Sequence, residues 1–336
     1  MKAVGYQQSL PIVDERALLD CDLPKPEPGP RDLRVSIKAV SVNPVDTKVR
    51  MRAAPPAGDY KILGYDAAGV VDAVGSEVTL FQPGDEVFYA GSLVRQGTNA
   101  EFHLADERIV GRKPRTLSFA EAAALPLTSI TAWELMFDRM GIARGKDDNR
   151  SLLIVGGAGG VGSIMIQLAR KLTGLTVLAT ASRPETIQWC LDLGAHHVID
   201  HSKPMKEQIE KLKAPPVDWI ASLTGTGKHF PALADILAPQ GAIGVIDDPT
   251  VLDATLLKSK AASLRWESMF TRSTFQTPDM IAQHHLLNQV ADMIDAGEIR
   301  TTLDKVFGKI TASNLRAAHA TIESGKSIGK IVLEGW

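Results

Sequence analysis

The sequence predicts an α/β fold in which a doubly wound parallel sheet is joined to an antiparallel β domain. Near the middle of the chain, the spacing of apolar residues changes from that of a strand to that of a helix across a glycine-rich turn. Further strand candidates then alternate with helical stretches, which is typical of a parallel sheet. Residues 1 to about 125 instead contain short alternating runs between Pro and Gly residues. A length of 336 residues favours two domains.

The glycine-rich turn lies within residues 151–162. Leu152–Val155 form an apolar run suited to a buried strand, and apolar residues then recur at helical spacing from Val161 to Leu172. A second strand candidate, Thr176–Thr180, completes a strand–helix–strand unit. The turn fits the pattern G-x-G-x-x-G, which lets backbone approach a pyrophosphate at a helix N-terminus. A plain structural turn is the alternative, and the context favours dinucleotide binding by Gly157, Ala158, Gly159, Gly160, Val161 and Gly162.

The residues after the second strand indicate which dinucleotide binds. NAD sites usually carry Asp or Glu there to hold the ribose 2′-OH, whereas this chain has Ala181-Ser182-Arg183. A hydroxyl and a guanidinium can bind a 2′-phosphate through charge-assisted hydrogen bonds. We therefore predict NADPH as the cofactor, bound by Ser182 and Arg183. The alternative for Arg183 is a solvated residue at the start of a helix.

Four more strands complete the predicted parallel sheet. The candidates are residues 198–199, 217–222, 242–246 and 261–265, separated by helical stretches near 184–193, 204–213 and 229–238. Ligands of such sheets bind beyond the carboxyl ends of the strands. Leu223, Thr224 and Ile246 follow or end strands there, so we expect them to contact the cofactor.

The segments before and after the parallel sheet supply the β domain and several further helices. Strands are predicted at residues 35–42, 69–75 and 85–90. Ser118 and Glu121 have the spacing of a capping box, so a helix begins there, and Leu125-Pro126 interrupts it before a second helical stretch at 129–140. A long helix is predicted at 278–297. Residues 302–333 then predict a strand, a helix at about 311–323 and another strand, which could return to the first domain.

Composition and charge exclude several classes of function. A formal net charge of −2 favours neither a nucleic-acid nor a membrane-surface partner. The chain has no transmembrane run, and its first residues do not resemble a signal peptide, so we expect a cytoplasmic protein. Cys21 and Cys190 are too few for a disulfide framework and should be reduced. We expect a small-molecule substrate as the partner.

The sequence resembles the medium-chain dehydrogenase/reductase superfamily along nearly its whole length. The resemblance is to the zinc-free quinone oxidoreductase branch, and specifically to bacterial proteins often labelled zinc-type alcohol dehydrogenase-like. It implies a GroES-like domain at 1–126 completed by 298–336, an NADP-binding Rossmann domain at 127–297, and a homodimer that extends the two cofactor sheets edge to edge. It also implies that Thr128 lies near the nicotinamide and His201 near the adenosine phosphate. The resemblance is carried by residues 39–46, 63–71, 83–87, 124–128, 157–162 and 328–332.

The residues at the metal positions of the family argue against zinc. Zinc-dependent members have a Cys where this chain has Asn43, and Gly-His-Glu where it has Gly64-Tyr65-Asp66. Structural zinc in those members needs four closely spaced cysteines. The adjacent pairs His196-His197 and His284-His285 lack metal-ligand spacing. We predict neither catalytic nor structural zinc.

Without a metal, the protein must polarise a substrate oxygen with hydrogen-bond donors. Asn43, Tyr65 and Lys48 are the candidates, and their alternatives are a turn residue, a packed aromatic ring and a solvated side chain. Asp46 is expected to orient loop backbone. Residues 270–275, with Trp266 and Met269, line either the substrate cleft or the core.

The first hypothesis for function is an NADPH-dependent oxidoreductase that delivers a hydride to a quinone or an α,β-unsaturated carbonyl. A reductase of one specific activated alkene, such as an enoyl thioester or a haloacrylate, is the second hypothesis. A non-catalytic NADPH-binding protein is the third.

Overall fold

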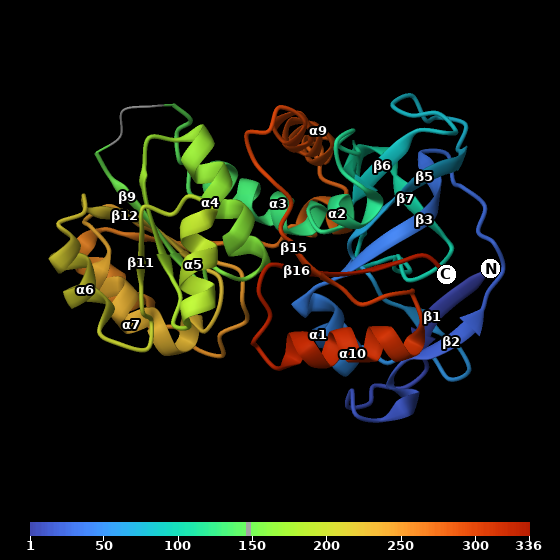
Figure 1. The fold of residues 1–336 in the computed structure, drawn as a ribbon, viewed down its shortest axis with the longest axis horizontal. Coiled ribbons are helices and arrows are strands. Elements are labelled where there is room, and N and C mark those ends of the chain that lie inside the picture. The colour runs from blue at the N-terminus through green and yellow to red at the C-terminus, as the bar shows by residue number, and fades with distance from the viewer. Residues whose placement is uncertain (146–148) are drawn as a thin grey trace. The chain divides into compact units, whose positions relative to one another are not determined.

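The computed structural model describes residues 1–145 and 149–336. The chain divides into two compact units, which are described separately below (Figure 1). The first unit comprises Met1–Ile130 and Phe270–Trp336, and the second comprises Thr131–Met269. No helix within the described ranges is both long enough and apolar enough to cross a membrane.

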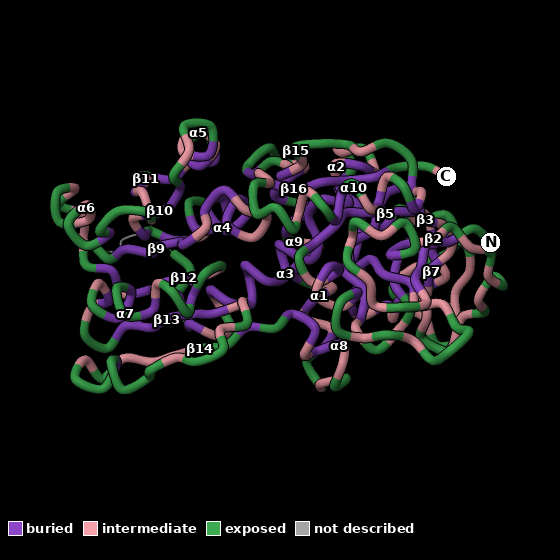
Figure 2. Tube along the Cα trace, turned by 90° about the horizontal axis from the view of Figure 1, so that it is seen from below, coloured by how far each residue is buried: buried purple, intermediate pink, exposed green. Residues whose placement is uncertain are grey.

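The second unit is built on a parallel sheet in the order β11-β10-β9-β12-β13-β14, six strands within the described part of the chain. Every neighbouring pair is parallel, and the order reverses direction at β9, so the predicted doubly wound sheet is confirmed. Helices α4 (Gly160–Leu172) and α5 (Pro184–Asp192) lie on one side of this sheet and α7 (Thr226–Ile236) on the other (Figure 2). The strands are β9 (Ser151–Val155), β10 (Thr176–Thr180), β11 (His197–Ile199), β12 (Val217–Ser222), β13 (Ala242–Val245) and β14 (Ser263–Trp266).

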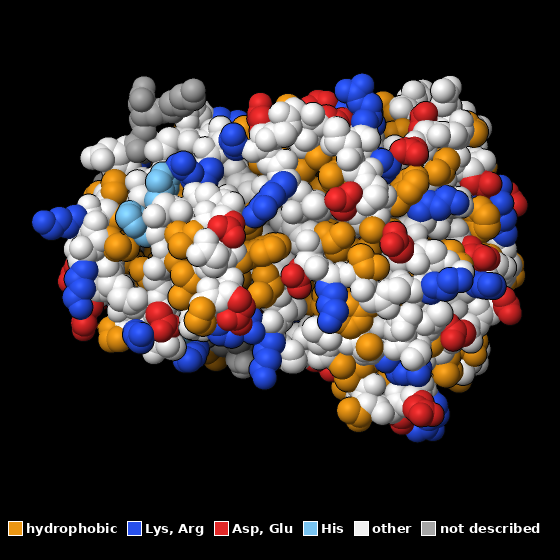
Figure 3. Space-filling view, viewed as in Figure 1, with side chains coloured by type: hydrophobic (Ala, Val, Ile, Leu, Met, Phe, Trp, Pro, Cys, Tyr) orange, Lys and Arg blue, Asp and Glu red, His pale blue; other side chains and the backbone are white. Residues whose placement is uncertain are grey.

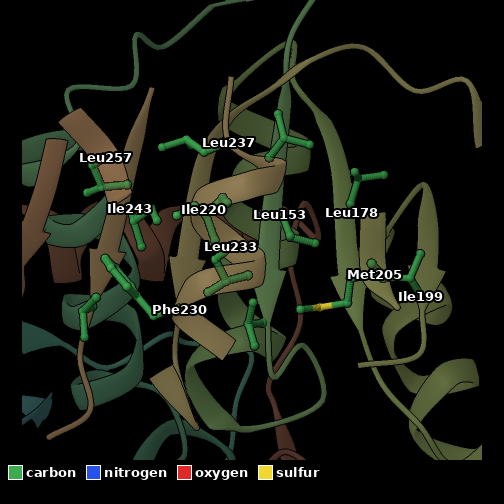
Figure 4. Close-up of a cluster of buried hydrophobic side chains, with 14 residues drawn as sticks. Leu153, Leu178, Ile199, Met205, Ile220, Phe230, Leu233, Leu237, Ile243 and Leu257 are labelled. Carbon is green, nitrogen blue, oxygen red and sulfur yellow. The ribbon is translucent and has the colours of Figure 1, made fainter. Parts of the chain in front are cut away.

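Apolar side chains from the sheet and the helices form one buried cluster in the second unit (Figure 4). Leu153, Leu178 and Ile220 come from three neighbouring strands and are fully buried. Phe230 and Leu233 of α7 face them (Figure 4). Burying each such side chain contributes about 1.5–3 kcal/mol, so this cluster holds the helix against the sheet.

The helices of the second unit begin and end close to the predicted residues, with one shift. Predicted helices at 184–193 and 204–213 are α5 (Pro184–Asp192) and α6 (Met205–Leu212). Helix α7 (Thr226–Ile236) begins before the predicted residue 229. Its first turn is capped by Asp247, whose carboxylate accepts a hydrogen bond from Thr226 N–H at 2.9 Å. Since Asp247 follows β13, local spacing did not reveal this cap. The remaining elements of this unit are α4 (Gly160–Leu172) and a 3₁₀ segment at Ala254–Lys260.

The predicted helix at 129–140 is two segments of different kinds. Helix α3 (Pro126–Trp133) begins at its proline, which is suited to a first helical position, and a π-helical segment, Glu134–Arg139, continues it. The capping box before it is confirmed, because Ser118 N–H donates to Glu121 Oε2 at 2.9 Å and Glu121 N–H donates to Ser118 Oγ at 3.3 Å. That box begins α2 (Phe119–Ala123).

The first unit contains two sheets. The smaller sheet has the order β2-β1-β4, and the larger has the order β15-β16-β3-β5-β6-β8, with β7 also paired to β3. All of these pairs are antiparallel except β15 with β16. Because β16 pairs with β3, the C-terminal tail returns to this domain, as its pattern suggested. The strands are β1 (Lys2–Tyr6), β2 (Leu19–Asp22), β3 (Asp32–Val42), β4 (Lys61–Ile62), β5 (Ala67–Val74), β6 (Glu86–Tyr89), β7 (Phe102–Asp106), β8 (Val110–Arg112), β15 (Leu303–Val306) and β16 (Lys330–Glu334).

The segment 270–297 packs with the first unit, although the predicted nucleotide-binding domain extended to residue 297. Helix α9 (Ala282–Asp295) lies against β8, where Arg112 N–H donates to Asn288 Oδ1 at 2.9 Å. An amphipathic pattern shows that a helix buries one face and does not show which sheet it covers. The other helices of this unit are α1 (Pro44–Arg52), α8 (Thr271–Phe275), α9 (Ala282–Asp295) and α10 (Ala312–Glu323), with 3₁₀ turns at Glu15–Ala17 and Glu107–Ile109.

Candidate functional site

The glycine loop of the second unit is shaped so that several of its positions require glycine. Gly156 has a φ of +87°. A Cβ atom on Gly157 would lie 2.8 Å from Ala179 Cβ, and one on Gly162 would lie 2.4 Å from Gly156 O. Thr180 holds the loop in place, since Gly157 N–H donates to its carbonyl at 3.1 Å. The tight turn and the close helix–strand packing expected from the motif are therefore both present.

The outer side of this loop is open and faces the N-terminus of α4. A Cβ atom on Gly159 would meet only Gly156 O, at 3.4 Å, and Gly159 caps the helix without any side-chain hydrogen bond. Backbone N–H groups and the positive end of the helix dipole are thus presented to a ligand. This geometry is the one that the glycine motif predicts for binding a pyrophosphate.

The residues predicted to contact the adenosine end lie together at the carboxyl edge of the sheet. Ser182 and Arg183 follow β10, and His201 follows β11. The two loops are joined where Ala181 N–H donates to Ile199 O at 3.0 Å. Arg183 precedes α5 and forms an ion pair with Glu185 at 3.2 Å, in a half-exposed position from which its guanidinium can reach a ligand.

Leu223 and Thr224 border the glycine loop on its other side. Leu223 N–H donates to Val155 O at 3.2 Å, and Thr224 Cγ2 lies 2.9 Å from the position that a Cβ on Gly156 would occupy. Ile246 directly follows β13 and is partly buried. These positions agree with the rule that ligands lie beyond the carboxyl ends of the strands.

A buried polar cluster in the first unit is formed by Lys330 together with Asn43 and Asp66, two of the residues that the resemblance compares with the metal positions of zinc-dependent members. The ammonium of Lys330 donates to Asn43 Oδ1 at 2.5 Å, to Asp66 Oδ2 at 3.1 Å and to Val42 O at 3.1 Å. Asn43 Nδ2 also donates to Asp66 Oδ2 at 2.8 Å. Lys330, Asn43 and Asp66 are all at most 3% exposed. The cluster is therefore an internally paired set of charges built around an ammonium ion.

Both polar atoms of the Asn43 side-chain amide form hydrogen bonds within this cluster, Oδ1 with Lys330 and Nδ2 with Asp66. The backbone N–H of Asn43 also donates to Asp46 Oδ2 at 2.8 Å, at the start of α1. These hydrogen bonds of Asn43 correspond to the turn-residue alternative more closely than to a donor aimed at a substrate. Lys48 lies further along α1 and is half-buried. The cation that donates hydrogen bonds to Asn43 and Asp66 is Lys330, a residue that the sequence did not single out.

Sequence reasoning missed Asp66 and Lys330 as members of the site. Both lie in segments that carried the family resemblance, residues 63–71 and 328–332. The sequence did contain one indication of their role: each is a charged residue next to residues expected to be buried, and a buried charge requires a partner.

Asp66 also connects the cluster to helix α3. Its Oδ1 accepts a hydrogen bond from Leu127 N–H at 2.7 Å, in the first turn of that helix. Burial raises the pKa of Asp66, and the nearby Lys330 and the bond from Asn43 oppose the shift. The next residue, Thr128, is buried, with its hydroxyl bonded to Leu125 O at 3.1 Å. The cluster thus fixes the turn that carries Thr128.

Asp46 orients backbone, as expected from the sequence. Its carboxylate accepts hydrogen bonds from Gly64 N–H at 2.9 Å and from Asn43 N–H. Complete burial raises the pKa of Asp46 to about 7, although these bonds and Lys330 oppose the shift. These contacts hold the segment on which Tyr65 lies.

Tyr65 differs from its neighbours because its hydroxyl has no hydrogen-bond partner in the described part of the chain. Its ring is buried and packs edge-on against Phe270, with the centroids 5.3 Å apart. Burial raises the pKa of the phenol, and Asp46 adds to the shift, so Tyr65 remains protonated and can donate. Of the other aromatic residues predicted near the substrate, Trp266 and Phe275 are exposed.

A cavity of about 550 Å³ lies in the first unit close to Tyr65. Gly91 is in its wall, and a Cβ on that residue would lie 3.8 Å from Tyr65 Cδ1. The hydroxyl of Ser92, also in the wall, is buried without a hydrogen-bond partner among the described residues. The cavity therefore reaches Gly91, which packs beside Tyr65, but Tyr65 itself does not line it.

The two histidine pairs have structural contacts. His196 Nδ1 accepts from Val177 N–H at 2.8 Å, and His284 Nδ1 lies 2.7 Å from Val110 O. Across residues 1–145 and 149–336, no three His, Cys, Asp or Glu side chains are grouped so that they could hold a metal ion.

Two family models match the chain. One describes the alcohol dehydrogenase GroES-like domain and covers residues 29–132, and the other describes a zinc-binding dehydrogenase and covers residues 193–333. Both matched ranges lie within the fold described above.

Individual relatives match nearly the whole chain. A zinc-type alcohol dehydrogenase-like protein of Staphylococcus aureus is 40% identical, with 99% of each chain covered. A crystal structure of a proposed zinc-dependent alcohol dehydrogenase from Rhizobium etli is 57% identical, with a TM-score of 0.97 over 100% of this chain and 98% of the other. The quinone oxidoreductase of Coxiella burnetii is 27% identical, with a TM-score of 0.80 over 100% and 99%. The chain therefore belongs to the medium-chain dehydrogenase/reductase superfamily of oxidoreductases, among the bacterial zinc-type alcohol dehydrogenase-like proteins.

Proposed function

We propose that this oxidoreductase uses NADPH to transfer a hydride to a quinone or an α,β-unsaturated carbonyl compound, without a metal ion. The observation that carries the proposal is the buried phenol of Tyr65, which has no hydrogen-bond partner among the described residues and stands beside a cluster whose cation is Lys330. NADPH, when bound, supplies the hydride. The glycine loop, Ser182 and Arg183 bind and orient it.

The residues of the first unit suit reduction of a conjugated carbonyl. Hydride addition to a quinone or an enone moves negative charge onto an oxygen, which a hydrogen-bond donor can stabilise. Tyr65 is the donor that we assign to this oxygen, through its hydroxyl hydrogen. Oxidation of a simple alcohol would instead need a Lewis acid or a strong base at that position. Lys330 provides neither, because its ammonium is saturated by three acceptors.

The comparisons support a quinone as the acceptor, and they raise the question of whether the protein contains zinc. The relative from Coxiella burnetii is a quinone oxidoreductase, which favours a quinone as acceptor. The relative from Rhizobium etli is described as zinc-dependent, so metal content must be measured directly. Protein purified without added metal should contain well below one equivalent of zinc. One bound equivalent would overturn our assignment of the Asn43 and Asp66 cluster.

The test of the reaction is NADPH oxidation followed at 340 nm with quinones, enals, enones, an enoyl thioester, a haloacrylate and a simple ketone, and with NADH in parallel. Turnover of a quinone or an enone with NADPH supports the proposal. Turnover of one enoyl thioester or haloacrylate alone would establish the specific-reductase alternative. Tight NADPH binding without turnover of any compound would indicate the non-catalytic alternative.

We also propose a homodimer in the cytoplasm. Strand β14 is an edge of the parallel sheet, and its Trp266 is 54% exposed. An edge strand with unpaired backbone groups can pair with its copy about a two-fold axis. Light scattering at micromolar concentration should give the mass of two chains, and a monomer would contradict the proposal. Side chains of both charges are interspersed on the face seen in Figure 3, which gives no support to a nucleic-acid partner.

A further inference from the structure

The cavity of about 550 Å³ in the first unit is separate from the residues assigned to the reaction. From Gly91 it extends to Asp32, where β3 begins, whereas Asn43 follows the other end of β3. Strand β3 has 11 residues, a length that spans roughly 30 Å. The described residues that line the cavity do not include Asn43, Lys48, Tyr65 or Lys330. A molecule in this cavity would therefore be a ligand other than the hydride acceptor.

The charged side chains of the cavity wall neutralise one another. Among the described lining residues, each arginine forms an ion pair with an acidic residue of the same wall. The pairs are Arg95 with Asp32 at 2.7 Å, Arg108 with Asp106 at 2.7 Å, and Arg31 with Glu77 at 3.4 Å. Arg95 and Arg108 each donate two hydrogen bonds to their partner, which fixes the guanidinium. A charged ligand would thus lose its hydration without gaining a countercharge from these pairs.

The remaining wall is neutral and partly apolar. His103 is buried, with Nδ1 2.9 Å from Tyr89 Oη and Nε2 2.9 Å from Gln96 O. Burial lowers the pKa of His103 to about 4, so its ring is uncharged at neutral pH. Ile109 and Met280 add buried apolar surface. Such a wall favours an uncharged ligand with an apolar body.

Ser92 supplies the wall with a polar atom that lacks a partner. Its side chain is 4% exposed, and its hydroxyl has no hydrogen-bond partner among the described residues. The turn that carries it is anchored, because Ser92 O accepts from Arg95 N–H at 3.3 Å and Arg95 is paired with Asp32. A buried hydroxyl without a partner is costly, so a ligand oxygen that bonds to it gains affinity.

A second serine of the wall is already satisfied. Ser273, in α8, donates a hydrogen bond from its hydroxyl to Phe270 O at 3.2 Å. The two serines therefore differ in what they offer a ligand, although both line the same cavity. Ser92 is the polar anchor, and Ser273 serves as its internal comparison.

We infer that this cavity binds an uncharged, mainly apolar molecule with a carbonyl or hydroxyl oxygen, and that the Ser92 hydroxyl forms a hydrogen bond with that oxygen. Its volume lies within the range of small-molecule sites, roughly 300–1,000 Å³. The inference is independent of the proposed reaction, since the cavity contains none of the residues assigned to NADPH or to the hydride acceptor.

The test uses acetophenone as the probe, in NMR titrations of the protein without cofactor. Ethylbenzene is the analogue without the oxygen, and phenylacetate is the charged analogue. We expect acetophenone to bind. The Kd of ethylbenzene should be about fivefold higher because a hydrogen bond is lost. The Kd of phenylacetate should be at least about tenfold higher because its carboxylate loses hydration without gaining a countercharge.

Two serine variants locate the oxygen of the probe. Ser92→Ala should raise the Kd of acetophenone about fivefold and leave the Kd of ethylbenzene unchanged. Ser273→Ala, whose hydroxyl is already bonded within the protein, is the matched control and should keep both wild-type values. Thermal melts verify folding, and Ser92→Ala should melt no lower than the wild type because the deleted hydroxyl has no partner among the described residues.

Several outcomes would overturn the inference. Equal affinity of the wild type for acetophenone and ethylbenzene would exclude the hydrogen bond, and tighter binding of phenylacetate would exclude an uncharged ligand. No binding of acetophenone by the wild type would exclude the site. If acetophenone binds Ser92→Ala normally but does not bind Tyr65→Phe, the ketone lies at the proposed reaction site instead. These measurements need no turnover, so their failure leaves the proposed reaction untouched.

Discussion

The ammonium of Lys330 donates to Asp66 Oδ2 at 3.1 Å, with the side chains 3% and 0% exposed. Lys330 begins the strand β16 near the C-terminus, whereas Asp66 precedes β5. A buried ion pair is strongly coupled, since removal of one partner leaves the other charge uncompensated in a low dielectric. The pair therefore ties the C-terminal strand to the segment that carries Tyr65.

Replacing the cation should destabilise the first unit. Lys330→Met removes the charge and leaves Asp66 buried, so we expect the free energy of unfolding to fall by about 3–5 kcal/mol. Urea unfolding measures this change. Lys305→Met, on the exposed face of the adjoining strand β15, should alter stability by no more than about 0.5 kcal/mol. Equal small effects in both variants would show that the ion pair contributes little.

Removing the phenolic hydroxyl should affect catalysis and spare the fold. Tyr65→Phe deletes a buried hydroxyl that has no partner among the described residues, so stability should stay the same or rise. Loss of a donor to the developing oxyanion should lower kcat by about 100-fold, with the Kd of NADPH unchanged. Tyr60→Phe is the control. A Tyr65→Phe variant with the wild-type kcat would remove Tyr65 from the mechanism.

Removing the guanidinium should weaken NADPH binding selectively. Arg183→Ala should raise the Kd of NADPH by at least about tenfold, because a charged hydrogen bond contributes about 1.5–3 kcal/mol. The Kd of NADH should not change. Lys211→Ala, an exposed cation in the same unit, is the control for general electrostatics. Fluorescence titration checks both cofactors, and an unchanged Kd for NADPH would support the solvated-residue alternative for Arg183.

Two glycines of the loop should respond differently to alanine. The methyl group of Gly162→Ala would collide with backbone carbonyls, so this variant should be strongly destabilised. Gly159→Ala meets only one atom, at 3.4 Å, so it should fold while its methyl group obstructs the pyrophosphate and raises the Kd of NADPH. Thermal melts and titration of both variants check this difference. If Gly159→Ala folds and binds NADPH normally, the pyrophosphate does not lie against this loop.

The buried carboxyl of Asp46 should give the stability a particular pH dependence. Its pKa is about 7 in the folded protein and 3.8 as the reference value. The folded state therefore binds the proton more tightly than the unfolded state does, and this stabilises the fold. The stabilisation is fully present below pH 3.8 and is lost as the pH rises through 7. Asp46→Asn lacks it, so its stability relative to the wild type should increase from pH 4 to pH 7, by at most about 1.4 kcal/mol per pH unit. Asp59→Asn, at an exposed position, should give a curve parallel to that of the wild type. Parallel curves for Asp46→Asn would refute the raised pKa.

Some elements escaped prediction because they are short or depend on distant partners. Helix α1 begins at Pro44, where the cap formed by Asn43 and Asp46 is recognisable only once Asp46 is seen to be buried. Strand β4 has two residues and exists because it pairs with β1. The helix predicted at 278–297 begins at Ala282, and its assignment to the first unit depends on contacts with β8.

The sequence by itself determined the parallel sheet and the glycine loop. Their patterns are local, since a buried strand, a sterically constrained turn and an amphipathic helix each depend on residues that are adjacent in the chain. The tertiary structure alone decided that Lys330 meets Asp66, that Tyr65 keeps a hydroxyl without a partner in the described ranges, and that Ser92 and Ser273 line the same cavity. Such contacts join residues far apart in the sequence, and they depend on how whole strands and helices pack.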